Sequence, residues 1–176
     1  MDVFQAIRER RSMRSFTDEP VTREQLHAVM EAATWAPTGG NIQAWCFVVI
    51  TDPGRIADIK AFSPGMLSDP KAVVVACSDL ERAAGRGGRL AHEILTLCDV
   101  SMACQNMMLA AHALGLGSCV IRSFSPVAVS KLLGLPDTVR PELLVALGHP
   151  TRVPPAPRRR PQEEVVHWET FGGREG

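Results

Sequence analysis

The sequence feature that most constrains the fold is a long helical pattern over residues 90–114. Apolar or small residues recur there at four-three spacing, which is the periodicity of one face of an α-helix. The C-terminal half of the pattern is apolar nearly all round, so we expect this helix to lie in a core or in a dimer interface. The predicted face consists of Leu90, Ile94, Leu97, Ser101, Cys104, Met108 and Ala111.

Shorter segments around this helix predict a layered α+β fold in which helices outnumber strands. Three consecutive valines within residues 71–77 are typical of a strand that is buried on both faces. Thr22, followed three residues later by Gln25, forms a capping-box pattern that begins a helix. Residues 85–88 are rich in glycine and predict a flexible loop. Further strands are predicted at 45–51, 118–121 and 143–147, and further helices at 1–11, after Asp52-Pro53 and after Ser125-Pro126.

Composition limits the classes of function. Nineteen basic residues balance nineteen acidic ones in 176 residues, so no overall field attracts nucleic acid or an anionic membrane. Residues 1–16 carry no apolar run of the secretory type, and we find no stretch of about 18 uninterrupted apolar residues. The five cysteines are odd in number and lack metal-ligand spacing, which predicts buried, reduced thiols, no metal and a cytoplasmic location.

Familiar cofactor and catalytic motifs are missing from the sequence. It contains no G-x-G-x-x-G after a strand, no P-loop, no G-x-S-x-G and no H-E-x-x-H. An enzyme with this sequence therefore needs an organic cofactor that is bound in another way.

Two arginine clusters are candidates for binding a phosphate. Arg10, Arg11, Ser12 and Arg14 end the first helical segment, and their guanidinium and hydroxyl groups suit charge-assisted hydrogen bonds to phosphate. The alternative is a solvated basic helix end that the helix dipole favours. A second run, Arg158-Arg159-Arg160, lies in the proline-rich residues 148–176, which predict an extended arm rather than a domain.

The loop at residues 36–45 is a candidate for contacting a flat ligand. Its glycines allow close approach of the backbone, while Asn41 and Gln43 offer amide donors and acceptors for the edge of a heterocycle. The alternative is an ordinary helix-to-strand loop beside a core tryptophan.

In this order, four segments resemble the FMN-dependent nitroreductase family. They are R-R-S-x-R-x-F at 10–16, A-P-x-G-x-N-x-Q-x-W at 36–45, Q-N-M-x-L-A-A-x-x-L-G-L-G at 105–117 and R-R-x-P-x-E-E-V-V-x-W at 158–168. The resemblance implies that residues 1–176 form a single domain, an α+β sandwich with a mixed sheet flanked by helices. It also implies a domain-swapped homodimer in which the arm at 148–176 extends onto the partner and FMN lies at the interface.

The resemblance further implies the residues that bind FMN. Arg10 and Ser12 would hold the phosphate and ribityl chain, and Arg14 would approach the N1/O2 edge of the flavin. The backbone of Arg11 contributes nearby. The other implied contacts are Pro37, Thr38, Gly39, Asn41 and Gln43 from the partner along the isoalloxazine, backbone N–H groups around Arg122 and Ser123 facing N5, and Arg158 or Arg159 over the phosphate.

The implied activity is an FMN-dependent NAD(P)H oxidoreductase that reduces small oxidised acceptors such as nitroaromatics or quinones by a ping-pong hydride mechanism. The flavin does the chemistry, so no side chain is named as catalytic. Longer members of the family place Glu-Gly near N5, where this chain has Arg122-Ser123, a difference that bears on the flavin potential.

Three alternatives remain open on the sequence. A flavin-binding relative could instead fragment flavin or dehalogenate, as in dimethylbenzimidazole synthase or iodotyrosine deiodinase. A non-catalytic FMN-binding redox sensor would bind flavin without its reduction by nicotinamide. A nucleic-acid binder is disfavoured by the zero net charge and the lack of a known motif.

Overall fold

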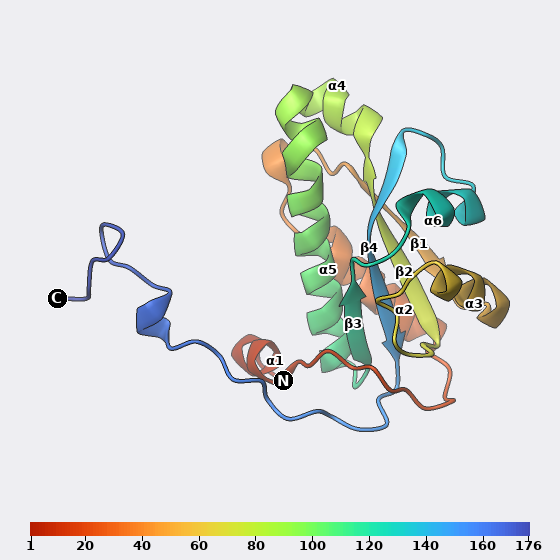
Figure 1. Cartoon of the computed structure of the whole chain (residues 1–176), viewed down its shortest axis with the longest axis horizontal. Coiled ribbons are helices and arrows are strands. Elements are labelled where there is room, and N and C mark those ends of the chain that lie inside the picture. The colour runs from red at the N-terminus through yellow and green to blue at the C-terminus, as the bar shows by residue number, and fades with distance from the viewer.

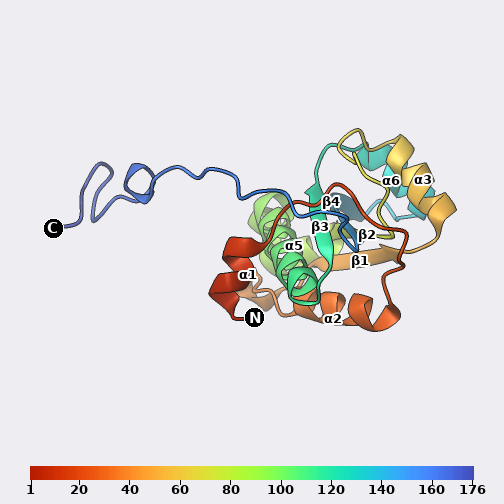
Figure 2. The same cartoon turned by 90° about the horizontal axis from the view of Figure 1, so that it is seen from below.

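A four-stranded sheet lies between two layers of helices in the computed structural model, which describes residues 1–176 (Figure 1). Helices α2 and α5 cover one face of the sheet, and α3 and α6 cover the other (Figure 2). The elements are α1 (Val3–Glu9), α2 (Arg23–Thr34), η1 (Gly39–Asn41), β1 (Trp45–Ile50), α3 (Pro53–Ala61), β2 (Ala72–Asp79), α4 (Leu80–Leu90), η2 (Ala91–Leu95), α5 (Thr96–Ala113), β3 (Gly117–Ile121), α6 (Pro126–Leu133), β4 (Val139–Gly148) and η3 (Gln162–Glu164). The predicted α+β sandwich is confirmed.

All neighbouring strands of the sheet run antiparallel, so the expectation of a mixed sheet was wrong. The strand order is β1-β2-β4-β3. Strands β2 and β3 run in the same direction, but β4 lies between them and pairs antiparallel with both. The one parallel pairing is an isolated bridge between Ser12 and Ser118 at the outer edge of β3.

Strand β2 separates two hydrophobic cores, as its run of valines predicted. Val74 packs with α2 and α5 on one face, whereas Val73 and Val75 pack with α3 and α6 on the other. Alternate residues of a strand point to opposite faces, so a strand with both faces covered is apolar throughout. All residues from Ala72 to Ser78 are buried.

The predicted glycine loop at 85–88 is helical, which corrects the sequence interpretation. Helix α4 includes these residues, and only Gly88 leaves helical geometry, with φ of 61°. A β-carbon on Gly87 would collide with the side chains of Ala91 and Ile42. The glycine there permits close packing of the helix and is not a sign of flexibility.

The long helix is buried along only part of the predicted face. Cys104, Met108 and Ala111 lie in the core against the sheet and α2. Leu90 and Ile94, nearer the start, are more than half exposed. The helical run from Leu80 to Ala113 is also long and apolar enough to cross a membrane, with a mean hydropathy of 1.3, although core helices meet the same criteria. Its exposed apolar side chains, such as Leu90, Ile94 and Leu97, lie in the middle of the run, near Leu95 and Asp99, which Gly39 of η1 contacts.

The cysteines differ in burial, which corrects part of the prediction. Cys77, Cys104 and Cys119 are buried, Cys46 is half-buried and Cys98 is exposed. All five are free thiols.

The segment after β4 extends away from the body of the molecule (Figures 1 and 2). It runs beside residues 15–16 at its start, where the Thr151 N–H donates to the Ser15 carbonyl at 3.2 Å. Beyond Pro154, almost every residue is exposed, including Trp168 and Phe171.

Candidate functional site

The outer edge of β3 carries the first predicted arginine cluster. Helix α1 ends at Glu9, and the extended chain after it then runs alongside β3. The Met13 N–H donates to the Ser118 carbonyl at 2.8 Å, which fixes residues 12–14 against the strand. A β-carbon on Gly117 would lie 2.7 Å from Met13 Cγ, so this close approach requires glycine.

Two observations indicate that this edge suits an anionic phosphate. Burial raises the pKa of the Cys119 thiol, and the positive charges of Arg14 and Arg10 oppose that shift. A hollow of about 200 Å³ beside them is lined by Ser12, Arg14, Ser15, Arg152 and Pro154. Hydroxyl and guanidinium donors without a carboxylate form the donor set that phosphate requires, so the residues fit the phosphate group of FMN.

Arg11 plays a different part from its two neighbours. Its Nη1 atom donates to the carbonyls of Arg8 at 2.6 Å and Arg10 at 2.9 Å. Its Nε atom is buried without a hydrogen-bond partner. The side chain thus closes the end of α1.

Arg122 and Ser123 lie at the other end of the same edge. They directly follow β3, and at about 3.3 Å per residue Arg122 is roughly 13 Å from Ser118 along the strand. The Arg122 guanidinium lies 5.6 Å from the centre of the Phe124 ring. The Ser123 carbonyl accepts the Gly65 N–H at 3.0 Å, which holds the turn. An elongated ligand along β3 can therefore contact both ends.

The predicted flavin loop has an unusual backbone. Asn41 and Gln43 have φ of 52° and 54°, and Gly40 between helix and strand has φ of 58°. Left-handed conformations are costly for residues other than glycine and concentrate at functional sites. Thr38 Oγ1 accepts the Gln43 N–H at 3.2 Å, and Gln43 Nε2 donates to Asn41 Oδ1 at 2.8 Å. Pro37 precedes this network and starts the loop.

Asp99 holds this loop and was missed by the sequence interpretation. Its Oδ1 atom accepts the Gly39 N–H at 3.2 Å, and the residue is 3% exposed. Burial raises the pKa of the Asp99 carboxyl, against a smaller opposing effect of the Gly39 hydrogen bond. Asp99 could have been identified from the sequence because it is an isolated carboxylate in an otherwise apolar helix. Arg82 adds a second tie, since its Nε donates to the Ile42 carbonyl at 2.7 Å.

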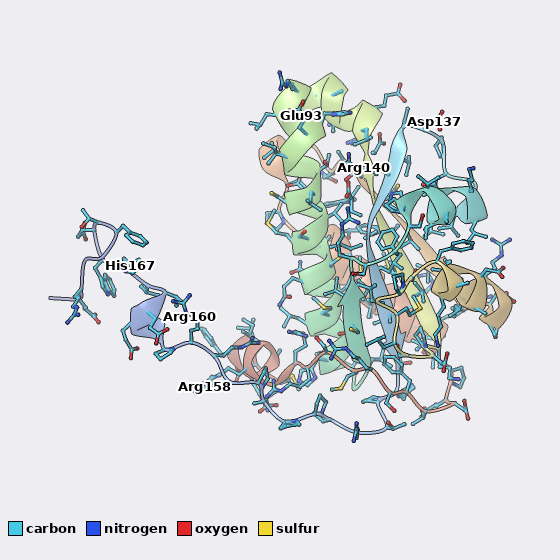
Figure 3. The ribbon with its side chains drawn as sticks, viewed as in Figure 1. Glu93, Asp137, Arg140, Arg158, Arg160 and His167 are labelled. Carbon is cyan, nitrogen blue, oxygen red and sulfur yellow. The ribbon has the colours of Figure 1, made fainter.

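The structure does not bring the loop and the β3 edge together within one chain. The loop packs against the start of α5. Ser118 comes after the end of α5, and the segment that carries Arg10 and Arg14 lies beside Ser118. An α-helix rises about 1.5 Å per residue, so the 18 residues of α5 span about 27 Å. The arm arginines are also remote: Arg158 and Arg159 are exposed, and Arg158 extends from the arm well outside the body (Figure 3).

Comparisons with known proteins identify the family. The family profile described as "Nitroreductase family" matches residues 7–71 and 55–149. The chain is 30% identical over 185 residues to "FMN reductase (NADPH)" from Bacillus subtilis (strain 168), covering 97% of this chain and 74% of that protein. It therefore belongs to the nitroreductase family.

Solved structures agree with this assignment. A nitroreductase family protein from Clostridium difficile 630 superposes with a TM-score of 0.86 and 29% identity, covering 97% of this chain and 99% of that one. The NADPH:FMN oxidoreductase from Vibrio harveyi, solved as a complex with NAD+, superposes with a TM-score of 0.85 and 28% identity, covering 95% of this chain and 76% of that one.

Proposed function

We propose that this chain is an FMN-dependent NAD(P)H oxidoreductase that reduces small oxidised acceptors such as nitroaromatics or quinones. The observation that carries the proposal is the arginine- and serine-lined edge of β3, which has the donor set and the length for a flavin mononucleotide. The names of the relatives from Bacillus subtilis and Vibrio harveyi support the same cofactor and electron donor.

Different residues along β3 bind different parts of FMN in this proposal. Arg10, Ser12 and Arg14 hold the phosphate and ribityl end, with Arg11 closing the helix beside them. When bound, FMN supplies the atom that accepts a hydride from NAD(P)H and later passes it to the acceptor. Backbone groups at Arg122 and Ser123 orient the reactive end. The balance of the reaction is NAD(P)H, one proton and an acceptor giving NAD(P)+ and the two-electron-reduced acceptor.

A homodimer completes this site in our proposal. Two observations support it: the 37–43 loop lies far from the β3 edge of its own chain, and the arm leaves its own body. A second copy would bring Pro37, Thr38, Gly39, Asn41 and Gln43 to the flavin ring and Arg158 or Arg159 to the phosphate. Residues 1–176 then act as one domain with an exchanged arm. We place the enzyme in the cytoplasm, with no nucleic-acid or membrane partner.

The test is a visible absorption spectrum of the purified protein, followed by anaerobic addition of NADH or NADPH. We expect a flavin band that bleaches on addition. A protein that neither retains FMN on purification nor binds added FMN contradicts the proposal. A flavin band that neither nicotinamide bleaches favours the redox sensor instead.

A further inference from the structure

The cofactor edge of this neutral protein carries five arginines, and Glu19 Oε1 lies 3.5 Å from His149 Nε2 at its border. Residues 10–17 run along the outer edge of β3, residues 62–68 contact its end and the turn after it, and residues 149–154 pair with residues 15–17; together with 117–125 in and after the strand, these segments form the cofactor edge. They contain no aspartate or glutamate, although the whole chain has 19. Their arginines are Arg10, Arg11, Arg14, Arg122 and Arg152.

Most of these arginines lie at the end of the edge where we propose that the phosphate binds. Arg10 and Arg14 act on Cys119, and Arg152 lines the same hollow as Arg14. Arg122 stands apart from them, roughly 13 Å along the strand from Ser118. A guanidinium at that distance is not needed for the phosphate, and its charge acts on whatever occupies the reactive end.

No carboxylate neutralises Arg122. It forms no ion pair and is exposed, while its guanidinium is stacked 5.6 Å from the Phe124 ring centre, and Phe124 itself is 8% exposed. Glu142 on neighbouring β4 is buried and pairs with Arg140 and Ser78. Asp137 precedes β4 and is remote from the end of β3 (Figure 3). Ile121 pairs with Leu144, which is seven residues after Asp137, so Asp137 lies roughly 20 Å from Ile121 along β4.

We propose that Arg122 selects acceptors that carry a negative charge, so that the preferred substrates are aromatic oxidants bearing a carboxylate. This inference rests on the proposed function. The guanidinium lies over the Phe124 ring, and its planar set of N–H donors matches a carboxylate in a bidentate manner. An electron acceptor with a carboxylate would gain this contact when it lies over the flavin, whereas a neutral analogue of the same shape would not.

The test uses benzoate and benzamide, which have the same shape and differ in charge. Each is titrated against the oxidised, FMN-loaded protein, and the flavin absorbance change gives the Kd. We expect wild type to bind benzoate more tightly than benzamide. Arg122→Gln should weaken benzoate about tenfold and leave benzamide unchanged, because one charge-assisted contact is lost. Arg122→Lys should retain part of the preference, and added salt should reduce it.

Matched controls separate the possible outcomes. Arg55→Gln removes an exposed arginine beside β1, at the opposite edge of the sheet, and should leave both Kd values unchanged. The ratio of kcat/KM for 4-nitrobenzoate over 4-nitrobenzamide should fall in Arg122→Gln and not in Arg55→Gln. Circular dichroism and FMN content establish that the variants are folded and loaded.

Three results would overturn the inference in distinguishable ways. Equal binding of benzoate and benzamide by a protein that holds FMN and is bleached by NAD(P)H contradicts the inference alone. Loss of NADPH affinity without loss of benzoate affinity in Arg122→Gln assigns the guanidinium to the electron donor. A wild type that does not bind FMN removes the proposed function, and the inference fails with it.

Discussion

Asp99 shows how one buried carboxyl group can connect the loop at residues 37–43 to the stability of the fold. Its oxygen accepts the Gly39 N–H from within an apolar helix, and burial disfavours its charged form. The folded-state pKa is therefore above the ordinary value of 3.8. The native state binds this proton more tightly than the unfolded chain, so the group costs stability as pH rises through the folded pKa.

We predict that Asp99→Asn stabilises the protein at pH 7.5 and has a smaller effect near pH 4. Asparagine keeps an oxygen acceptor for Gly39 but does not ionise, so it avoids the cost that the wild type meets at higher pH. Urea unfolding at fixed protein concentration, repeated across this pH range, measures the difference. Parallel stability curves for the two proteins would contradict the assigned cause, and Asp99→Leu is the comparison that removes the acceptor.

Gly117 tests the close approach of residues 12–14 to β3. A β-carbon there would lie 2.7 Å and 2.9 Å from Met13 Cγ and Cβ. We predict that Gly117→Ala lowers the free energy of unfolding by about 1–3 kcal/mol, as overpacking usually does, and weakens FMN binding because residues 12–14 move. Gly85→Ala is the matched control, since nothing lies within 4 Å of its β-carbon. An equal loss in both variants would contradict this explanation.

The sequence suggested candidate site residues by their chemistry, whereas their positions came from the structure. Residue type left two interpretations of Arg10, Arg11, Ser12 and Arg14, a phosphate cluster or a solvated helix end, and the phosphate role was implied by the family resemblance. The structure adds that this segment lies against β3. Asp99 was not predicted as a loop contact, because its partner, Gly39, is 60 residues away in the chain. Contacts of that kind depend on packing that no local pattern encodes.

Among the elements, helix α2 has the best-defined start. Thr22 Oγ1 accepts the Gln25 N–H at 3.2 Å, and Gln25 Oε1 accepts the Thr22 N–H at 2.9 Å, which confirms the predicted capping box. We predict that Thr22→Ala lowers the free energy of unfolding by about 1 kcal/mol, measured by urea denaturation. Thr22→Ser retains the hydroxyl and should lose far less; equal losses would assign the effect to the threonine methyl group.

Elements were predicted well where one local signal decides them. The valines of β2 and the capping box of α2 are such cases. Helix α4 was mistaken for a loop because its glycines weaken helix propensity. Its N-cap at Asp79 and the burial of Ala83 outweigh that weakness. The antiparallel sheet was missed because strand order depends on where β4 inserts, which alternation within a strand does not reveal.

At the scale of the whole molecule, the arm is the element that a single chain leaves without a partner. Val153, Trp168 and Phe171 are largely exposed on it. We predict that deleting residues 153–176 converts the proposed dimer into monomers and abolishes FMN binding, because the apolar side chains and arginines of the arm would no longer reach a second subunit. Light scattering coupled to size exclusion measures the mass, and circular dichroism checks that the body remains folded. A truncated protein that stays dimeric would contradict the arm's role.

Strand β4 has a consequence for how the chain is made. It pairs with β2 on one side and β3 on the other, and no other strand joins those two. A ribosome-bound chain lacking residues 139–148 thus holds the paired strands β1 and β2 and a β3 that no strand joins to them. The four-stranded sheet is therefore completed only after about four-fifths of the chain has emerged from the ribosomal exit tunnel, and until then one side of the valine-rich β2 lacks its partner strand.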